Sequence, residues 1–540
     1  MHKGYLCIVL HAHLPYIRHA EYDYFLEENW LYEAITGTYI PLLDVLERLL
    51  NDNIDFRITL SLSPPLVEML NDNLLKMRYQ KYIERLIELS DRERLRIRGD
   101  IHFEPVVRMY AQRFQRIRYL FEEVYGKDLT SAFRALRDTG KVELITSVAT
   151  HAFLPNLSMY PQAIRAQIKI AAEYFKKNFH KSPSGIWLPE CGYASGIDEH
   201  ARKEGIQFFF LDTHGILFGQ PLPRYGVYAP VSCPSGVFAF GRDVETSKQV
   251  WCSVGGYPGD IDYREFYRDI GFDLDLDEIG PYIHPDGIRT YTGLKYYRIT
   301  GKTDKKKPYV REQARKKAAE HACHFIFNRE LQIDFLCKAF KDLRIPLKPV
   351  VTSLYDAELF GHWWFEGPDW LDFLLRGIDK GHVNFRTITP AEYLQLLPSQ
   401  CAGLQSCQPS MSSWGHKGYS EVWLNNSNDY IYRHLHKTTE RMINLAGRFD
   451  NASGILRRAL NQALRELLLS QHSDWAFIMD SSTAAEYARK RFEEHIVRFN
   501  NLYHSIIEGH ISEGWLREIE EKDRIFQDID YRVFRNGNKR

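Results

Sequence analysis

The chain has 540 residues, with 70 basic and 70 acidic side chains, so its formal net charge is zero. This balance argues against nucleic acid as the main partner, because nucleic-acid binding usually requires a basic face. The length predicts roughly two to four domains with ample core. Aromatic residues make up 14% of the chain, which suits sugar binding but equally a large core with amphipathic rims.

The N-terminus leads from Met1 directly into a strand-like run and has no signal-peptide architecture. No stretch reaches the roughly 18 continuous apolar residues of a membrane span. The eight cysteines are scattered without metal-type spacing, since Cys401 and Cys407 are too far apart for a paired motif. We therefore expect a cytoplasmic protein with reduced thiols, no metal, no cofactor and no membrane partner.

The first part of the chain alternates between strand and helix patterns. Apolar runs at 5–10 and 56–62 predict buried strands, and residues 30–50 between them have helical periodicity. This order predicts an α/β fold with a parallel sheet. Residues 66–140 are highly charged and helical in pattern, which predicts a helical insertion between two strands.

The alternation returns after the insertion. Strands are predicted at 142–148, 185–188, 208–212, 238–240, 249–251, 349–355 and 383–387, with helices at 161–179 and 318–343. The long connection 213–236 predicts a functional or disordered loop. Residues 255–300 are expected to cover the mouth of the sheet, and the basic segment 302–317 is expected to be exposed to solvent.

The pattern changes near residue 395. A Ser/Gln/Cys-rich link at 398–413 precedes helical patterns near 427–447, 453–471, 482–508 and 512–525. We therefore predict an α/β domain over 1–397, with the insertion at 66–140, and an all-helical domain over 398–540.

Polar residues follow the ends of the predicted strands. They are His11, His13, His151, Glu190, Asp212, His214 and Asp356. In a barrel the carboxyl ends of the strands converge on one face, so these residues are expected to meet. Two carboxylates that flank a glycosidic bond can act as nucleophile and general acid/base, with a separation of about 5–5.5 Å in retaining enzymes. A structural salt bridge is the alternative reading of Glu190.

Four segments resemble the ordered motifs of glycoside hydrolase family fifty-seven: His11-Ala12-His13-Leu14-Pro15, Thr150-His151-Ala152-Phe153-Leu154-Pro155, Trp187-Leu188-Pro189-Glu190-Cys191-Gly192-Tyr193 and Tyr355-Asp356-Ala357-Glu358-Leu359-Phe360-Gly361-His362-Trp363. Ser412-Ser413-Trp414-Gly415, followed by Trp423, is similar to the branching members of that family. The resemblance covers nearly the whole chain, including the helical tail.

The resemblance implies an incomplete (β/α)7 barrel with a helical insertion and a helical C-terminal domain that closes one wall of the active site. It implies cleavage of an α-1,4-glucan and transfer to a glucose 6-hydroxyl, as in glycogen synthesis. Glu190 would be the nucleophile and Asp356 the general acid/base. His11, His13 and His151 would line the donor pocket, and Trp414, Trp423 and Asp474 would bind the glucan.

Weaker correspondences suggest substrate contacts by Arg268 and Gly287, with Arg264 as a rival of Arg268. Phe272 stands near a position where some relatives are expected to have tryptophan, which could change acceptor preference. Three alternatives remain open: a hydrolase that uses a metal at the His-x-His motif, an α-amylase or 4-α-glucanotransferase of the same family, and a glucan-binding protein without activity.

Overall fold

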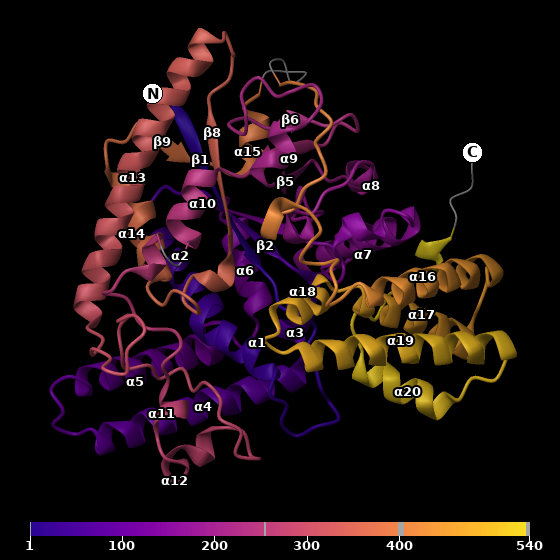
Figure 1. The fold of residues 1–540 in the computed structure, drawn as a ribbon, viewed down its shortest axis with the longest axis horizontal. Coiled ribbons are helices and arrows are strands. Elements are labelled where there is room, and N and C mark those ends of the chain that lie inside the picture. The colour runs from indigo at the N-terminus through magenta and orange to yellow at the C-terminus, as the bar shows by residue number, and fades with distance from the viewer. Residues whose placement is uncertain (1, 253–254, 398–403, 536–540) are drawn as a thin grey trace.

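The computed structural model describes residues 2–252, 255–397 and 404–535 (Figure 1). A nine-stranded sheet lies at its centre in the order β6-β7-β5-β4-β3-β2-β1-β8, with β9 also paired to β1. The pair β6–β7 is antiparallel and the other pairings are parallel. The strands are β1 Gly4–Ala12, β2 Ile58–Leu62, β3 Val142–Thr146, β4 Gly185–Ile186, β5 Phe208–Leu211, β6 Val231–Ser232, β7 Phe238–Gly241, β8 Val350–Asp356 and β9 Phe385–Thr387.

The sheet curls until the region of β7 meets β8, without a continuous ladder between them. Two backbone hydrogen bonds join this seam: Asp243 N donates to Thr352 O at 2.9 Å, and Val350 N donates to Tyr228 O at 2.9 Å. The predicted incomplete barrel with parallel strands is confirmed. The carboxyl ends of its strands therefore open on one common face.

The interior of the curled sheet is filled with side chains. Every residue of β1 is buried. Its odd-numbered residues Tyr5, Cys7 and Val9 pack in one cluster with Trp187 and Phe208, whereas the even-numbered ones pack against the surrounding helices. Because the barrel is packed rather than hollow, a substrate can be received only at its mouth.

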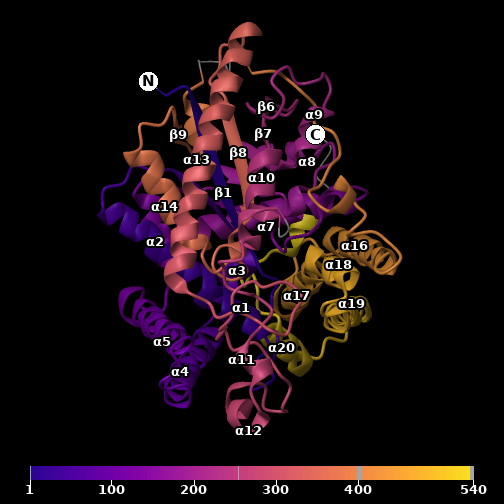
Figure 2. The same cartoon turned by 60° about the vertical axis from the view of Figure 1, so that its left-hand side comes forward.

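Helices surround the sheet, and the predicted helical insertion is confirmed between β2 and β3. The pair α4–α5 projects from the barrel on the side opposite the C-terminal helices (Figures 1 and 2). The Asp72 side chain caps α4 by accepting a hydrogen bond from Leu75 N. These helices are α1 Glu28–Ala34, α2 Ile40–Asn51, α3 Pro64–Asn71, α4 Asn73–Arg96, α5 Glu104–Tyr119, α6 Leu129–Asp138, α7 Pro161–Phe179 and α8 Ile197–Lys203.

The later helices of the barrel domain are α9 Thr213–Leu217, α10 Val244–Trp251, α11 Ile270–Asp273, α12 Leu276–Ile279, α13 Arg311–Asp342, α14 Gly367–Lys380 and α15 Pro390–Gln395. The C-terminal region is helical, as predicted: α16 Tyr430–Arg448, α17 Gly454–Ser470, α18 Ser473–Ser481, α19 Ala485–Glu508 and α20 Glu513–Lys522. The separate helix α18 had not been predicted. The predicted domain boundary falls on residues 398–403, outside the described part of the chain.

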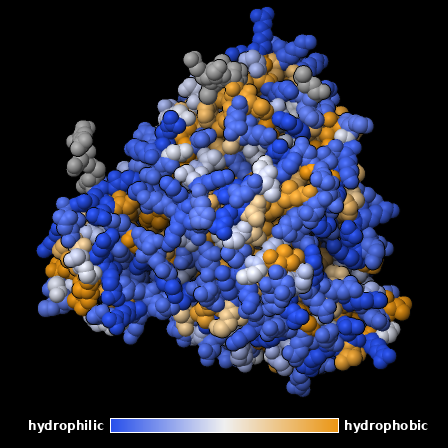
Figure 3. All heavy atoms as spheres, turned by 180° about the vertical axis from the view of Figure 1, so that it is seen from behind, coloured by the Kyte–Doolittle hydropathy of each residue, from blue (hydrophilic) through white to orange (hydrophobic). Residues whose placement is uncertain are grey.

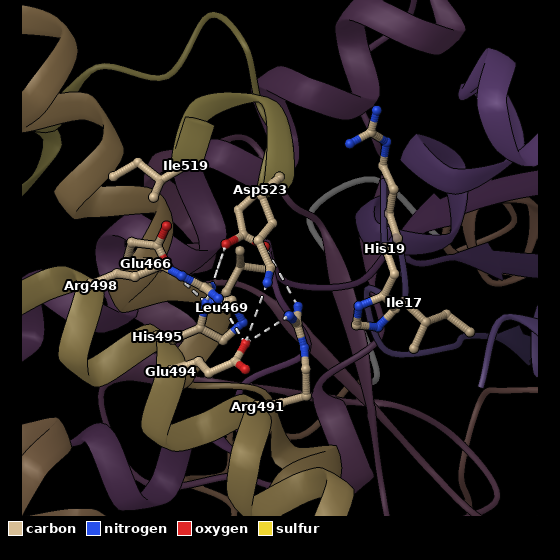
Figure 4. A network of polar contacts seen from close by, with 12 residues as sticks. Ile17, His19, Glu466, Leu469, Arg491, Glu494, His495, Arg498, Ile519 and Asp523 are labelled. Atoms are coloured by element: carbon tan, nitrogen blue, oxygen red, sulfur yellow. Dashed lines mark hydrogen bonds and ion pairs between the residues drawn. The ribbon is translucent and has the colours of Figure 1, made fainter. Parts of the chain in front are cut away.

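A buried charged network joins α17, α19 and the end of α20 (Figure 4). His495 Nδ1 lies 2.7 Å from a Glu466 carboxylate oxygen, and Arg498 lies 2.7 Å from Asp523. Arg491 lies 3.6 Å from the other oxygen of Asp523. We call these five residues the Glu466 network; it lies beside Ile17 and His19 of the segment that follows β1 (Figure 4).

Three local predictions are wrong. Residues 249–251 form the last turn of α10 rather than a strand, because the Asp243 side chain caps this helix at Thr246 N. The basic segment 302–317 is largely exposed, as expected, but the helix predicted at 318–343 already begins at Arg311, which pairs with Asp369.

The third concerns the connection 213–236, which was expected to be a functional or disordered loop. It begins with the short helix α9 and pairs through Gln220 and Ser232 with Gln408 and Ser406. None of its residues lines the cavity described below.

No helix in the described residues is long and apolar enough to cross a bilayer. The face seen in Figure 3 is mainly hydrophilic, with apolar side chains in separate small groups.

Candidate active site

Glu190 lies in a tight turn directly after β4. Its φ of +61° and that of Cys191, +51°, are in the left-handed region, which costs free energy for residues other than glycine and persists only where surrounding contacts enforce it. Trp414 supplies those contacts twice: its backbone N donates to Glu190 O at 2.9 Å, and its Nε1 donates to Glu190 Oε2 at 2.8 Å. Ser473 Oγ donates to Glu190 Oε1 at 3.2 Å. The turn is thus held from the C-terminal part of the chain.

Asp356 is the last residue of β8 and lies opposite His11 in the register of β1 and β8. A third carboxylate, Glu358, follows in the next turn. Glu358 Oε1 accepts hydrogen bonds from Tyr39 OH at 2.5 Å and from His13 N at 3.1 Å. Glu358 is therefore fixed beside Asp356 by neutral donors, without a cationic partner among them.

Three histidines predicted from strand ends do meet. His11 Nε2 lies 2.9 Å from His151 Nε2, and the rings of His13 and His151 stack with centroids 3.6 Å apart. Ser61, at the end of β2, lies 3.0 Å from His11 Nδ1. Burial lowers the pKa of His11 and of His151 well below the ordinary value. Both imidazoles are therefore neutral at physiological pH and can donate and accept hydrogen bonds with sugar hydroxyls.

The pKa of each of the two carboxylates is raised. Burial raises the pKa of Glu190 to about 7, although the hydrogen bond from Trp414 opposes this rise. Burial and then the nearby Glu358 and Glu190 charges raise the pKa of Asp356 well above its ordinary value. A carboxyl whose pKa is raised can hold a proton near neutral pH, as the general acid of a carboxylate pair must.

Asp474, in the first turn of α18, behaves differently. Burial would raise its pKa, but His13 and the hydrogen bonds from His13 and His472 hold the pKa well below the ordinary value. Asp474 Oδ2 lies 3.0 Å from His13 Nε2 and 3.2 Å from His472 Nδ1. Asp474 is therefore an anion that contacts two imidazoles at hydrogen-bond distance.

These groups face a cavity of about 940 Å³ at the mouth of the barrel. His11, His13, His151, Glu190, Asp356, Trp414, Trp423 and Asp474 all line it. Its aromatic residues are Trp251, Phe266, Tyr267, Trp363, Trp414, Trp423 and Phe477. Phe266 stacks on Trp363 with centroids 4.2 Å apart, and Trp363 is 51% exposed. Flat apolar faces next to a few polar groups suit a carbohydrate ligand.

Only some of the residues predicted to contact the substrate line the cavity. Trp423 lines the cavity but is 1% exposed and stacks on Phe153, so most of its ring is core. Arg268 lies outside the lining because it pairs with Asp273 at 2.7 Å, whereas its rival Arg264 lines the cavity. Gly287 occupies a turn with open space around it and does not line the cavity.

Phe272 also lies outside the cavity, with its ring against Tyr291. The segment 255–300, which was expected to cover the mouth, contributes Pro258, Gly259, Arg264–Tyr267 and Ile299 to the wall.

The lining or contacting residues that sequence reasoning missed include Arg242, Trp251, Glu358 and Ser473. Arg242 directly follows β7, so the strand-end rule that selected Asp212 could have found it. Trp251 was assigned to a strand and is instead at the end of α10. Only the tertiary structure brings Ser473 to Glu190, 283 residues away.

Comparison with known proteins agrees with this architecture. The family model for glycosyl hydrolase family 57 matches residues 7–332, and the model for the C-terminal domain of 1,4-alpha-glucan branching enzyme matches residues 434–534. A curated 1,4-alpha-glucan branching enzyme of Thermococcus kodakarensis is 30% identical, over 98% of this chain and 78% of that protein.

Two solved structures are similar over almost their full length. The alpha-amylase AmyC from Thermotoga maritima is 43% identical, with a TM-score of 0.91, covering 98% of this chain and 99% of that one. A branching enzyme of this type from Pyrococcus horikoshii is 31% identical, with a TM-score of 0.86, covering 100% and 98%. The chain described here belongs to glycosyl hydrolase family 57.

Proposed function

We propose that this protein is a retaining 1,4-α-glucan branching enzyme that uses Glu190 as nucleophile and Asp356 as general acid/base. The observation that carries the proposal is that both carboxylates line one aromatic-rich cavity, where burial raises the pKa of each. The match of residues 434–534 to the C-terminal domain of branching enzymes supports transfer as the outcome. Amylose and glycogen-like α-glucans are the substrates proposed.

The first step forms a glycosyl-enzyme. Ionised Glu190 attacks the anomeric carbon of an α-1,4 linkage, and Asp356 protonates the oxygen of the leaving chain. The Trp414 and Ser473 hydrogen bonds fix both oxygens of Glu190. Neutral His11 and His151, with ionised Asp474, would orient the hydroxyls of the donor sugar.

The second step transfers the chain to an acceptor. Formation of the ester removes the negative charge of Glu190, which is one of the charges that raise the pKa of Asp356. The pKa of Asp356 therefore falls. Asp356, which has given its proton to the leaving chain, stays ionised and can accept the proton of the acceptor 6-hydroxyl. The exposed Phe266–Trp363 pair at the cavity wall supplies a face on which an acceptor glucan could stack.

Hydrolysis is the second candidate, because a structure named as an alpha-amylase is 43% identical to this chain. Hydrolysis and branching share the glycosyl-enzyme and differ only in whether water or a sugar hydroxyl attacks it. A 4-α-glucanotransferase differs from both in using the acceptor 4-hydroxyl.

One incubation separates these outcomes. Amylose is treated with the enzyme, and new α-1,6 linkages are counted by proton NMR beside new reducing ends. Branching gives many α-1,6 linkages and few reducing ends. Reducing ends without α-1,6 linkages would identify a hydrolase, and redistribution of chain lengths without either would identify a 4-α-glucanotransferase. Glucan binding without any of these changes would indicate a protein that has lost activity.

A further inference from the structure

Arg242 lies at the seam where the open barrel closes between β7 and β8. It directly follows β7 and precedes Asp243, whose backbone N donates to Thr352 of β8 across the seam of the open barrel. Its own backbone is fixed on the other side, because Arg242 N donates to Leu211 O of β5. The side chain, 8% exposed, lines the cavity together with Glu190 and Asp356.

The guanidinium of Arg242 lies over the face of Trp414, with Cζ 5.1 Å from the ring centroid. The ring of Trp251 also stacks on Trp414, with centroids 6.1 Å apart and planes inclined by 28°. Trp414 in turn donates its Nε1–H to Glu190 Oε2. A cation over an indole face is attractive, so this contact stabilises the orientation from which Trp414 holds Glu190.

The positive charge of Arg242 is not neutralised by a close ion pair with any described residue. The nearest carboxylate oxygen recorded for it, on Asp212, lies 4.0 Å from Nη1, and its buried Nε has no hydrogen-bond partner. The other arginine in the cavity wall, Arg264, stacks on Phe365 at 4.2 Å and donates to Tyr110 OH. Arg242, not Arg264, is the cation that acts on Asp356.

We propose that Arg242 is a positioning residue of this site: its guanidinium holds the Trp414 indole against Glu190 and supplies the positive charge that balances Asp356. The inference rests on the proposed roles of Glu190 and Asp356 and extends them to the seam of the barrel. Without this charge, Asp356 would face only carboxylates and neutral groups and would be slow to give up its proton to the leaving chain in the first step.

The groups that act on Asp356 come from several elements. Glu358, Glu190 and Asp474 raise its pKa after burial, and Arg242 lowers it. Tyr39 and Cys191 also face this carboxyl, and burial raises the pKa of both, so both are neutral at physiological pH. The ionic balance at Asp356 is therefore three carboxylates against one guanidinium.

The test compares Arg242→Gln, which removes the charge, with Arg242→Lys, which keeps the charge but loses the planar stack. Arg315→Met, on the exposed surface of α13, is the control for loss of an arginine elsewhere. Total cleavage of amylose is measured by loss of iodine staining between pH 4 and 10, because this readout counts branching and hydrolysis alike.

We expect Arg242→Gln to move the alkaline limb of kcat/KM upward by about one pH unit, the size typical of losing one nearby opposite charge. We also expect kcat at neutral pH to fall by about tenfold, because Asp356 gives its proton to the leaving chain less readily as general acid in the first step. Arg242→Lys should keep the alkaline limb of the wild type and show a changed KM. Arg315→Met should match the wild type throughout.

An unchanged alkaline limb in a folded Arg242→Gln protein would overturn the inference. If that variant does not fold, a shifted limb in Arg242→Lys would overturn it equally, because the charge is retained there. Neither result depends on where the glycosyl group goes. If the wild type only hydrolyses amylose, the proposed branching function is wrong. The role of Arg242 is still decided by the alkaline limb of the pH profile, which does not depend on the acceptor.

Discussion

Two groups of buried carboxylates in this molecule have different surroundings. In the Glu466 network, Glu466 and Asp523 are met by Arg498, Arg491 and His495 (Figure 4). At the barrel mouth, Glu190 and Glu358 receive hydrogen bonds from neutral donors, and both line a cavity of about 940 Å³ together with Asp356.

The comparison teaches that a perturbed pKa does not by itself identify a catalytic carboxylate. Burial raises the pKa of Glu466 as well as those of Glu190 and Asp356. The distinction lies in the partners and in access, because structural ion networks also perturb carboxylates.

The same comparison argues against a metal in the Glu466 network, although Glu466, His495 and Asp523 present ligand atoms within 4.8 Å of one another. The two carboxylates already face two arginines. A divalent cation would add unbalanced charge to a buried site.

The largest contrast is expected from two matched substitutions. Glu190→Gln should reduce total amylose cleavage by at least about a thousandfold, because the amide cannot form the covalent intermediate, while glucan binding is largely preserved. Glu466→Gln should leave kcat within about threefold, measured well below the melting temperature, because it lies outside the cavity. Near-normal cleavage by Glu190→Gln would show that another group is the nucleophile.

The opposite contrast is expected in stability. Arg498→Met should lower the free energy of unfolding by about 3–5 kcal/mol, because Asp523 and Glu466 would remain buried without this partner. Arg489→Met, on the exposed side of the same helix α19, should change it by less than about 0.5 kcal/mol. Thermal and denaturant unfolding measure both. Equal stability of the two variants would mean that the buried arginine is dispensable for the network.

The pH dependence of stability sharpens the comparison at Glu190. Its pKa is raised from 4.5 to about 7 in the folded protein, so the folded state binds this proton more tightly than the unfolded chain does. The proton linkage of Glu190 stabilises the fold fully below pH 4.5, and this contribution is lost as the pH rises to about 7. Relative to wild type, Glu190→Gln should therefore gain stability, by on the order of 2–3 kcal/mol, between pH 4.5 and 8.

Calorimetry at both pH values gives this difference directly, with Glu265→Gln, whose carboxylate is paired with Lys306, as a comparison. A constant difference between Glu190→Gln and wild type across this range would mean that Glu190 has an ordinary pKa in the folded state.

The smallest effect is expected from removal of metal ions. Exhaustive chelation should leave amylose cleavage unchanged within about 10–20%, because the proposed mechanism uses only the two carboxylates. Loss of activity that returns with added Zn²⁺ would instead favour metal chemistry at His13, His472 and Asp474, whose ligand atoms lie within 4.8 Å of one another.

Much of the fold was predictable because it is encoded locally. Apolar runs gave most of the strands, and helical periodicity gave the insertion and the C-terminal helices. The errors at 249–251 and at the start of α13 arose where a single capping residue, Asp243, or a distant ion pair, such as Arg311 with Asp369, contributes to the conformation. Neither influence is visible in a short window of sequence.

The sequence by itself determined which residues stand at the strand ends, including His11, His151, Glu190 and Asp356, because strand termini follow from local patterns. The tertiary structure alone decided their partners. It brings Trp414 and Ser473 from 224 and 283 residues away to hold Glu190, and it places Arg242 at the seam while directing Arg268 to Asp273. Such contacts depend on how the barrel closes and where the helical domain docks, and residues far apart in sequence meet only then.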